Sequence, residues 1–229
     1  MLILPSIMVL IFTSLIPLGY SLYNSFTSLN LSLGKSYSLV GFDNYLNAFK
    51  DELFTRSFLV TILFVIVTVA LEVALGVAIA LLFSREGRKF GLSRTLLLLP
   101  MVSTPVVVGI LWRILLNTDY GVVNYILSWF GVSKVNWLAD PTFAVISIIA
   151  VDIWQWTPFM VLIVIAALLS VPQELIEAST IDGAGKWITF WSVRLPCILP
   201  VFLIAALLRF IDAFKVIDTV YVMTYGDPG

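Results

Sequence analysis

Residues 58–83 read FLVTILFVIVTVALEVALGVAIALLF, an apolar run with a single charge, Glu72. A helix needs about 20 predominantly apolar residues to cross the hydrocarbon core of a bilayer, so this run predicts a transmembrane helix. Similar segments lie on both sides of it, although Arg209 and Asp212 interrupt the last one. The chain is therefore predicted to be an all-α integral membrane protein, a polytopic helical bundle whose five visible transmembrane helices cover residues 2–23, 58–83, 95–116, 143–169 and 195–214.

The composition supports a membrane protein and argues against several other classes. Hydrophobic residues make up 60% of the 229 and charged residues 12%, and the mean hydropathy is +1.05, whereas a soluble domain carries about 25% charged residues. The formal net charge of -1 gives no reason to expect a nucleic-acid partner. With no histidine and one cysteine, Cys197, the chain lacks the commonest general base and any basis for a disulfide. We expect no catalytic residue and no metal ligand.

The distribution of basic residues predicts how the helices are oriented. Lysine and arginine concentrate in short loops on the cytoplasmic side of a membrane. The short loop 84–94 is rich in them, whereas the longer loops 24–57 and 117–142 are poor in them. We therefore expect the N-terminus and the loop 170–194 in the cytoplasm, and the two long loops outside. The basic residues of the short loop are Arg85, Arg88, Lys89 and Arg94.

Two prolines, Pro100 and Pro105, lie in the third apolar segment. Proline removes one backbone N–H and clashes with the preceding turn. Backbone groups that it frees inside a membrane need a partner or a water-lined cavity. The pair is expected to loosen or kink this helix, although prolines are frequent in transmembrane helices.

The loop 170–194 is polar and predicts a helical elbow on the cytoplasmic surface. Ser170 is placed at the cap of a first helix with Pro172 in its first turn. Asp182-Gly183 ends that helix, because glycine adopts the positive φ that other residues avoid. Lys186–Val193 is expected to form a second short helix before Leu195-Pro196 turns the chain back into the membrane. A solvated connector is the plain alternative, but the apolar side of the first helix suits another protein's groove.

The motifs of this elbow resemble a known family. Glu177-Ala178-Ser179, Asp182-Gly183-Ala184 and Leu195-Pro196 resemble the EAA loop of permease subunits of binding-protein-dependent ABC importers, and their form is similar to the carbohydrate-uptake branch. Further stretches that agree with that branch are 41–45, 119–124, 153–159 and 218–224.

The resemblance has two departures. The family usually has alanine at the position of Ser179, and both residues are small enough for close docking. The family usually has a sixth transmembrane helix after a Gly-Gly-Pro turn, whereas this chain reads Gly226-Asp227-Pro228-Gly229 and stops. Five of the six helices of a type I importer permease are thus expected here, with both ends of the sequence cut.

What the resemblance implies is a transport mechanism in a prokaryotic inner membrane. An extracytoplasmic binding protein would deliver a sugar, a di- or oligosaccharide, to a path formed by this chain and a second permease subunit. Two ATPase subunits would bind ATP and Mg, and this chain would not, since it has no Gly-x-x-x-x-Gly-Lys-Ser/Thr phosphate loop. The residues that would couple this chain to an ATPase are Glu177, Ala178, Ser179, Asp182, Gly183 and Ala184.

Charged and aromatic residues inside the predicted spans are candidates for the substrate path, because ionisable groups are costly in a bilayer. Carboxylates accept hydrogen bonds from sugar hydroxyls, and aromatic rings stack on sugar rings; Asp152 and Trp156 share one helix face. For Asp152 and Glu72 an interhelical structural pair remains the alternative, with Arg113 suggested as a partner of Asp152. The candidate path residues are Asp152, Trp156, Glu72 and Arg113.

A second set of charges, Arg209, Asp212 and Lys215, recurs at helical spacing in the last segment. These residues can form a ladder along one face. That face is expected either to line the path or to lie buried against the partner permease, because it would be very costly against lipid.

The sequence leaves two kinds of transport function open as alternatives and argues against a third kind, an enzyme. The same machine could carry glycerol phosphate, with Arg113 or Arg209 in the path, or a polyamine, with Asp152 and Glu72 in it. A stand-alone channel or secondary transporter would need no ATPase and would use Glu72 as its coupling carboxylate. An intramembrane enzyme has no nucleophile–base pair to support it.

Overall fold

The computed structural model describes residues 3–28, 38–84 and 91–226, and in that part of the chain the secondary structure is helical apart from one isolated bridge between Thr27 and Leu39. The backbone divides into two compact units, residues 1–60 and 61–229. Residues 85–90 of the basic loop that predicts the orientation lie outside the described residues. Within the described residues, four helices are long and apolar enough to cross a membrane, or five when a bent pair counts as one span.

The described part of the first unit contains one complete helix of this kind, a short amphipathic helix and the beginning of α4 (Glu52–Ser84). The apolar helix comprises α1 (Leu4–Leu10), a π-helical turn (Ile11–Leu15) and α2 (Ile16–Ser25), and it buries none of its residues. The short helix predicted after Gly41 is present as α3 (Asp43–Lys50), and Gly41 has the positive φ of 59° that the turn requires. Asn44 Nδ2 donates to the carbonyl oxygens of Ser25 and Thr27, which fixes α3 against the end of α2.

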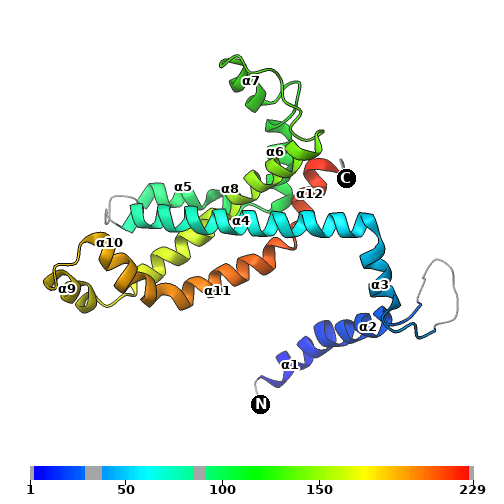
Figure 1. The fold of residues 1–229 in the computed structure, drawn as a ribbon, viewed down its shortest axis with the longest axis horizontal. Helices are drawn as coiled ribbons and strands as arrows, with labels where there is room; N and C mark the ends of the chain where they lie inside the picture. Colours follow the sequence, from blue (N-terminus) through cyan, green and yellow to red (C-terminus); the bar gives the residue numbers. More distant parts are fainter. Residues whose placement is uncertain (1–2, 29–37, 85–90, 227–229) are drawn as a thin grey trace. The chain divides into compact units, whose positions relative to one another are not determined.

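The second unit is built around α8 (Pro141–Leu169), the most buried of the long helices (Figure 1). Asp140 determines where α8 begins, because its carboxylate accepts from the N–H groups of Thr142 and Phe143 and Pro141 suits the first turn. The part of α4 (Glu52–Ser84) that follows residue 60 packs on α8 at Gly76. The other helices in contact with α8 are α5 (Gly91–Val102), α6 (Pro105–Leu115), α11 (Leu195–Ala213) and α12 (Ile217–Thr224).

The third predicted span is broken, not merely loosened. α5 and α6 meet at an angle of 101° across Ser103 and Thr104. Pro100 lies inside α5. Pro105 is the first residue of α6, a position where a backbone N–H has no partner within the helix, so the proline costs no hydrogen bond there. α6 then packs along α12, and a Cβ on Gly109 would lie 3.0 Å from Val222 Cγ1. α12 itself was not predicted.

The turn predicted at Leu195-Pro196 is wrong. α10 (Lys186–Thr189), a π-helical turn (Phe190–Arg194) and α11 follow one another without a break, so a single helical stretch runs from Lys186 to Ala213. A π-helical turn is an ordinary way for a helix to absorb a proline, because local widening accommodates the missing N–H. Pro196 lies in the first turn after it.

Two apolar clusters form the interior of the second unit, and ionic residues lie between them. One cluster contains Val65, Val69, Val151 and Met223, and the other contains Ala80, Val161, Val164 and Ile198. Glu72, Asp152 and Arg209 each fall between the two clusters along their own helices. The bundle therefore has an ionic layer within an otherwise apolar interior.

Candidate functional site

The ionic layer joins three helices through one arginine. Arg209 of α11 is 2% exposed, Asp152 of α8 is 4% exposed and Glu72 of α4 is fully buried. Arg209 Nη2 donates to Glu72 Oε1 at 3.0 Å and to Asp152 Oδ2, while its Nε lies 2.8 Å from Glu72 Oε2. The planar guanidinium presents several donors in a fixed fork, so one side chain satisfies two carboxylates from different helices.

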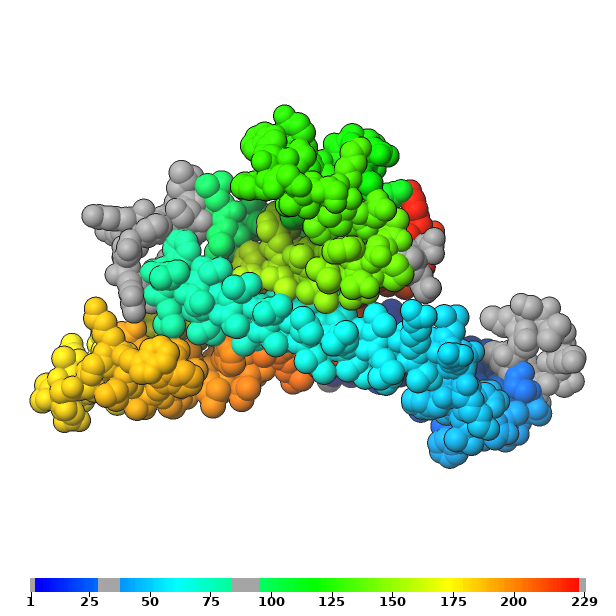
Figure 2. Space-filling model, turned by 45° about the horizontal axis from the view of Figure 1, so that its top comes forward, coloured from blue at the N-terminus to red at the C-terminus, as the bar shows by residue number. Residues whose placement is uncertain are grey.

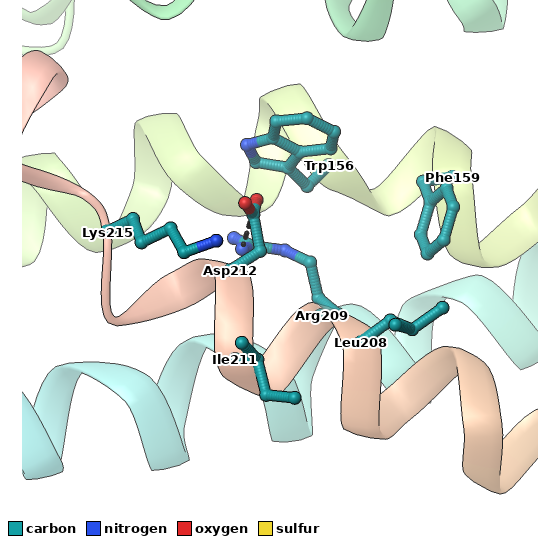
Figure 3. A pocket seen from close by; sticks show the side chains of 7 residues that line it. All are labelled: Trp156, Phe159, Leu208, Arg209, Ile211, Asp212 and Lys215. Carbon is teal, nitrogen blue, oxygen red and sulfur yellow. Dashed lines mark hydrogen bonds and ion pairs between the residues drawn. The ribbon is translucent and has the colours of Figure 1, made fainter. Parts of the chain in front are cut away.

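A cavity of about 360 Å³ opens beside this arginine (Figure 3). Trp156 and Phe159 of α8 line one side of the cavity, and α11 together with Lys215, just after its end, supplies the other side. Arg209 Cζ lies 5.2 Å from the centre of the Trp156 ring, within the range of a cation–π contact. The volume falls in the range of small-molecule sites. The remaining lining residues are Leu208, Ile211, Asp212 and Lys215.

The three charges predicted to form a ladder in the last span differ in exposure: Arg209 is buried, whereas Asp212 and Lys215 are accessible where they line the cavity. Arg209 lies inside this chain's own bundle, so, of the two alternatives for the ladder, burial against a partner permease does not apply to Arg209. Arg209 Nη1 lies 3.5 Å from Asp212 Oδ2, and Asp212 is half-exposed. Figure 3 shows the Lys215 amine directed toward Asp212 and Arg209 at one end of the cavity. The cavity therefore has aromatic rings on α8, and charges on α11 and directly after it.

Arg113 lies elsewhere and does not pair with Asp152 in the described structure. Its guanidinium stacks on the Tyr225 ring at 3.9 Å, and its Nη1 donates to the Val222 carbonyl at 3.5 Å. These contacts are at the C-terminal end of α12, where a cation is favoured by the helix dipole. Both arginines on which glycerol phosphate transport would depend, Arg113 and Arg209, thus have partners within the chain.

The broken span obtains a hydrogen-bond partner from α8. Gln155, which is almost fully buried, donates from Nε2 to the Ser103 carbonyl oxygen at 3.2 Å, at the bend between α5 and α6. A carbonyl freed by a helix break needs such a donor inside a membrane. Gln155 lies between Asp152 and Trp156 along α8, so one stretch of this helix holds the bend, the ionic layer and the cavity wall.

The elbow predicted in the loop 170–194 is present and exposed. α9 (Gln173–Ile181) ends at Asp182, and Gly183 follows with φ of 77°. Ser179, the departure from the family pattern, shares a hydrogen bond of 3.2 Å with Thr189 of α10, which ties the two helices together. Figure 2 shows the yellow residues of α9 at an edge of the second unit.

The predicted capping box is wrong. Ser170 Oγ donates to the Ala167 carbonyl, so it closes the end of α8 and does not begin α9. Pro172 is the residue before α9, and the structure shows no side-chain cap there. The reason is that serine hydroxyls bond as readily to a preceding carbonyl as to a following N–H.

The predicted coupling residues occupy this exposed elbow. Glu177 and Ala178 are exposed on α9, and Asp182 and Gly183 are exposed at its end. Ile181 is 86% exposed and Leu175 is also exposed, whereas Ile176 packs on the inner apolar cluster. An acidic helix with unpartnered apolar side chains suits a groove on another protein. Ser179 and Ala184 are partly buried beneath that face.

Comparison with known families now identifies the chain. Residues 72–228 match the family model described as "Binding-protein-dependent transport system inner membrane component". The chain belongs to this family. The matched residues of this permease include the ionic layer, the cavity and the elbow.

Curated relatives of this permease include sugar transport proteins. It is 40% identical over 190 residues to the trehalose/maltose transport system permease protein MalF of Thermococcus litoralis, a match that covers 83% of the chain and 64% of the relative. It is 32% identical to the sulfoquinovosyl glycerol transport system permease protein SmoG of Agrobacterium fabrum, over 100% of the chain and 74% of the relative. The chain thus spans between about two thirds and three quarters of these proteins' lengths.

A solved structure confirms the fold of the permease. A chain from the crystal structure of a bacterial ABC transporter involved in the import of the acidic polysaccharide alginate superimposes with a TM-score of 0.78. The two chains are 25% identical, and the match covers 93% of this chain and 72% of the other. The predicted fold, an all-α permease of the ABC importer kind, is confirmed.

The structure adds site residues that the sequence did not single out. Phe159 lines the cavity, and Gln155 holds the bend in the third span. Gln155 carried a signal, since a polar side chain within an apolar span needs a partner. Phe159 carried no signal beyond its place in the stretch 153–159, because a phenylalanine in a transmembrane helix is ordinary.

Proposed function

We propose that this chain is one permease subunit of an ATP-driven importer, that it forms half of the path for a sugar delivered by an extracytoplasmic binding protein, and that α9 couples it to an ATPase subunit. The observation that carries the proposal is the exposed elbow of α9 and Gly183 in a chain of this family. Trehalose and maltose are the first sugars to test, because the name of the Thermococcus relative includes both.

The coupling role follows from what the elbow exposes. Glu177 offers a carboxylate for a charged contact, and Ala178 beside it lets another chain approach closely. Ile181 and Leu175 provide apolar area that the described chain leaves uncovered. ATP and Mg would bind to the partner ATPase, and its motion would reach α11 through the tie between Ser179 and Thr189.

Glu177→Lys and Gly183→Val are expected to abolish ATPase docking without unfolding the bundle. The first reverses a charge at the predicted contact, and the second forces a branched residue into a positive φ, at a cost of about 1–2 kcal/mol. Among the described residues, no atom lies within 4 Å of a Cβ at Gly183, so the strain is confined to the backbone. Co-purification with the ATPase and sugar uptake at matched expression measure the effect.

Asp119→Lys is the matched control for the charge reversal. Asp119 is exposed, and its ion pair with Lys134 at 3.7 Å is a surface pair of little energetic value. If Glu177→Lys retains the ATPase and the uptake rate of the Asp119→Lys variant, α9 is not the coupling element.

The path role is best supported for Trp156, which lines the cavity directly. Glu72 and Asp152 are satisfied by Arg209 and are absent from the cavity wall, so we assign them to holding the arginine under the ring. A sugar would stack its C–H face on Trp156 and reach the half-exposed Asp212 with a hydroxyl group.

Trp156→Ala is expected to lower sugar uptake by roughly tenfold, since an aromatic contact of this kind contributes about 1–2 kcal/mol. Trp156→Phe should retain much of the rate because it keeps an aromatic face. Trp154→Ala is the control: Trp154 is two residues away, contacts Trp112 and does not line the cavity. Uptake of labelled trehalose and maltose measures the rates, and equal losses in the two alanine variants would contradict a path through this cavity.

A further inference from the structure

The loop 170–194 is divided by charge into two halves. Its acidic residues, Glu174, Glu177 and Asp182, lie on or directly after α9. From Gly183 to Ile211 the sequence contains no aspartate or glutamate, and the first cations of that stretch are Lys186 and Arg194. The two halves therefore favour partners of opposite charge, because unlike charges attract and like charges repel at short range.

The basic half carries large exposed aromatic side chains. Trp187 is 71% exposed and Trp191 is 51% exposed, and their rings meet edge to face at 5.7 Å. Phe190 and Thr189 of the same stretch are buried. One side of the stretch 186–194 thus packs on the bundle, and the other side exposes two indole rings with a cation at each end.

The length of the helical stretch places these indoles near the membrane surface. Lys186–Ala213 has 28 residues, so it is about 42 Å long, whereas the hydrocarbon core is about 30 Å thick. Arg209, near the other end of this helix, is held in the ionic layer between the two apolar clusters. The part of the helix that extends beyond the hydrocarbon core therefore lies at the Lys186 end. A surplus of about 12 Å corresponds to about eight residues, which reach from Lys186 to Val193.

We propose that Lys186–Arg194 forms an interfacial anchor that binds the anionic headgroups of the bilayer. Trp187 and Trp191 lie at the boundary between acyl chains and headgroups, where tryptophan is enriched. Lys186, which is exposed, and Arg194, which is half-buried, donate to lipid phosphates. The anchor goes beyond the proposed coupling role and does not depend on it.

The charge pattern favours lipid over the ATPase as the partner of this half. A surface of anionic lipid attracts Lys186 and Arg194 and repels the carboxylates of α9. α9 is therefore held away from the bilayer, where a soluble protein reaches it. In this arrangement the anchor orients the elbow, and the two faces do not compete for one partner.

Tryptophan fluorescence in vesicles tests the placement. The full-length protein and a Trp187→Phe/Trp191→Phe variant are reconstituted in equal parts of phosphatidylcholine and phosphatidylglycerol. The difference in emission between the two proteins is the emission of Trp187 and Trp191. We expect lipids brominated near the headgroup end of the acyl chain to quench this emission, and aqueous iodide not to quench it. Trp112→Phe/Trp154→Phe, a second tryptophan pair in contact, is the control, and its lost emission should respond to lipids brominated deeper in the chain.

Native mass spectrometry tests the charge contacts. Lys186→Gln/Arg194→Gln is expected to weaken phosphatidylglycerol binding by about fivefold for each charge removed. Lys50→Gln/Arg56→Gln removes the same charge elsewhere and should leave that binding unchanged. If iodide quenches the emission of Trp187 and Trp191, and addition of the ATPase abolishes that quenching, this face docks the ATPase. The proposal of a lipid anchor would then be wrong. Equal lipid loss in both double variants would also overturn it.

Discussion

Arg209→Met is expected to destabilise the bundle by about 3–5 kcal/mol, the cost of removing one partner from a buried ion pair. Glu72 and Asp152 would remain inside the bundle without the cation that satisfies both. The three groups come from α4, α8 and α11, so their loss loosens three helices together. Intrinsic fluorescence during thermal unfolding in detergent should show an apparent Tm lowered by roughly 10 °C.

Two further variants separate this explanation from a general effect of mutating α11. Lys215→Met removes a nearby cation that has an exposed side chain, and we expect a change within about 0.5 kcal/mol. Arg209→Met combined with Glu72→Gln and Asp152→Asn should recover much of the stability, because a neutral group of similar shape needs no counter-charge. If the triple variant is less stable than Arg209→Met alone, the ionic layer does not work as a charge-balanced unit.

The long-range pairing of charges could not be predicted from the sequence, although every member of the ionic layer was noticed there. Glu72 and Asp152 were identified as costly charges with interhelical pairing as an alternative, and Arg209 was assigned to a separate ladder. Helical spacing predicts which residues share a face on one helix. It does not predict which faces of distant helices meet, and Glu72 lies 137 positions from Arg209.

Local signals predicted the exposed elbow better than they predicted the helix boundaries around it. Asp182-Gly183 ends α9 because only the glycine's conformational freedom suits that turn. The chain was expected to turn at Pro196, yet a π-helical turn carries the helix through the proline. Ser170 was expected to begin a helix and instead closes one. Where a residue can adopt either of two local arrangements of similar stability, tertiary packing decides which one forms.

A second large effect is expected at Gly76, where α4 and α8 approach most closely. A Cβ at this position would lie 2.5 Å from Met160 Cβ and 3.3 Å from the Met160 carbonyl carbon. Small residues allow such close packing of membrane helices, which depends on van der Waals contact. Gly76→Leu must therefore push α8 away and disturb Asp152 along the same helix, with a loss of about 3 kcal/mol or more in stability and reduced uptake.

The geometry supplies matched controls for Gly76. Gly19→Leu adds the same atoms to an apolar helix at a site where no atom of the described chain lies within 4 Å of a Cβ, so it should be neutral or slightly stabilising. Gly76→Ala already places the clashing Cβ, so it should cost nearly as much as the leucine in spite of its better helix propensity. Met160→Gly removes the opposing Cβ, whereas Met160→Ala keeps it. Gly76→Ala should therefore cost less in the Met160→Gly protein but not in the Met160→Ala protein. A double-mutant cycle on unfolding free energies measures this difference. Equal costs in both backgrounds would mean that the approach of α4 to α8 is not limited by these two atoms.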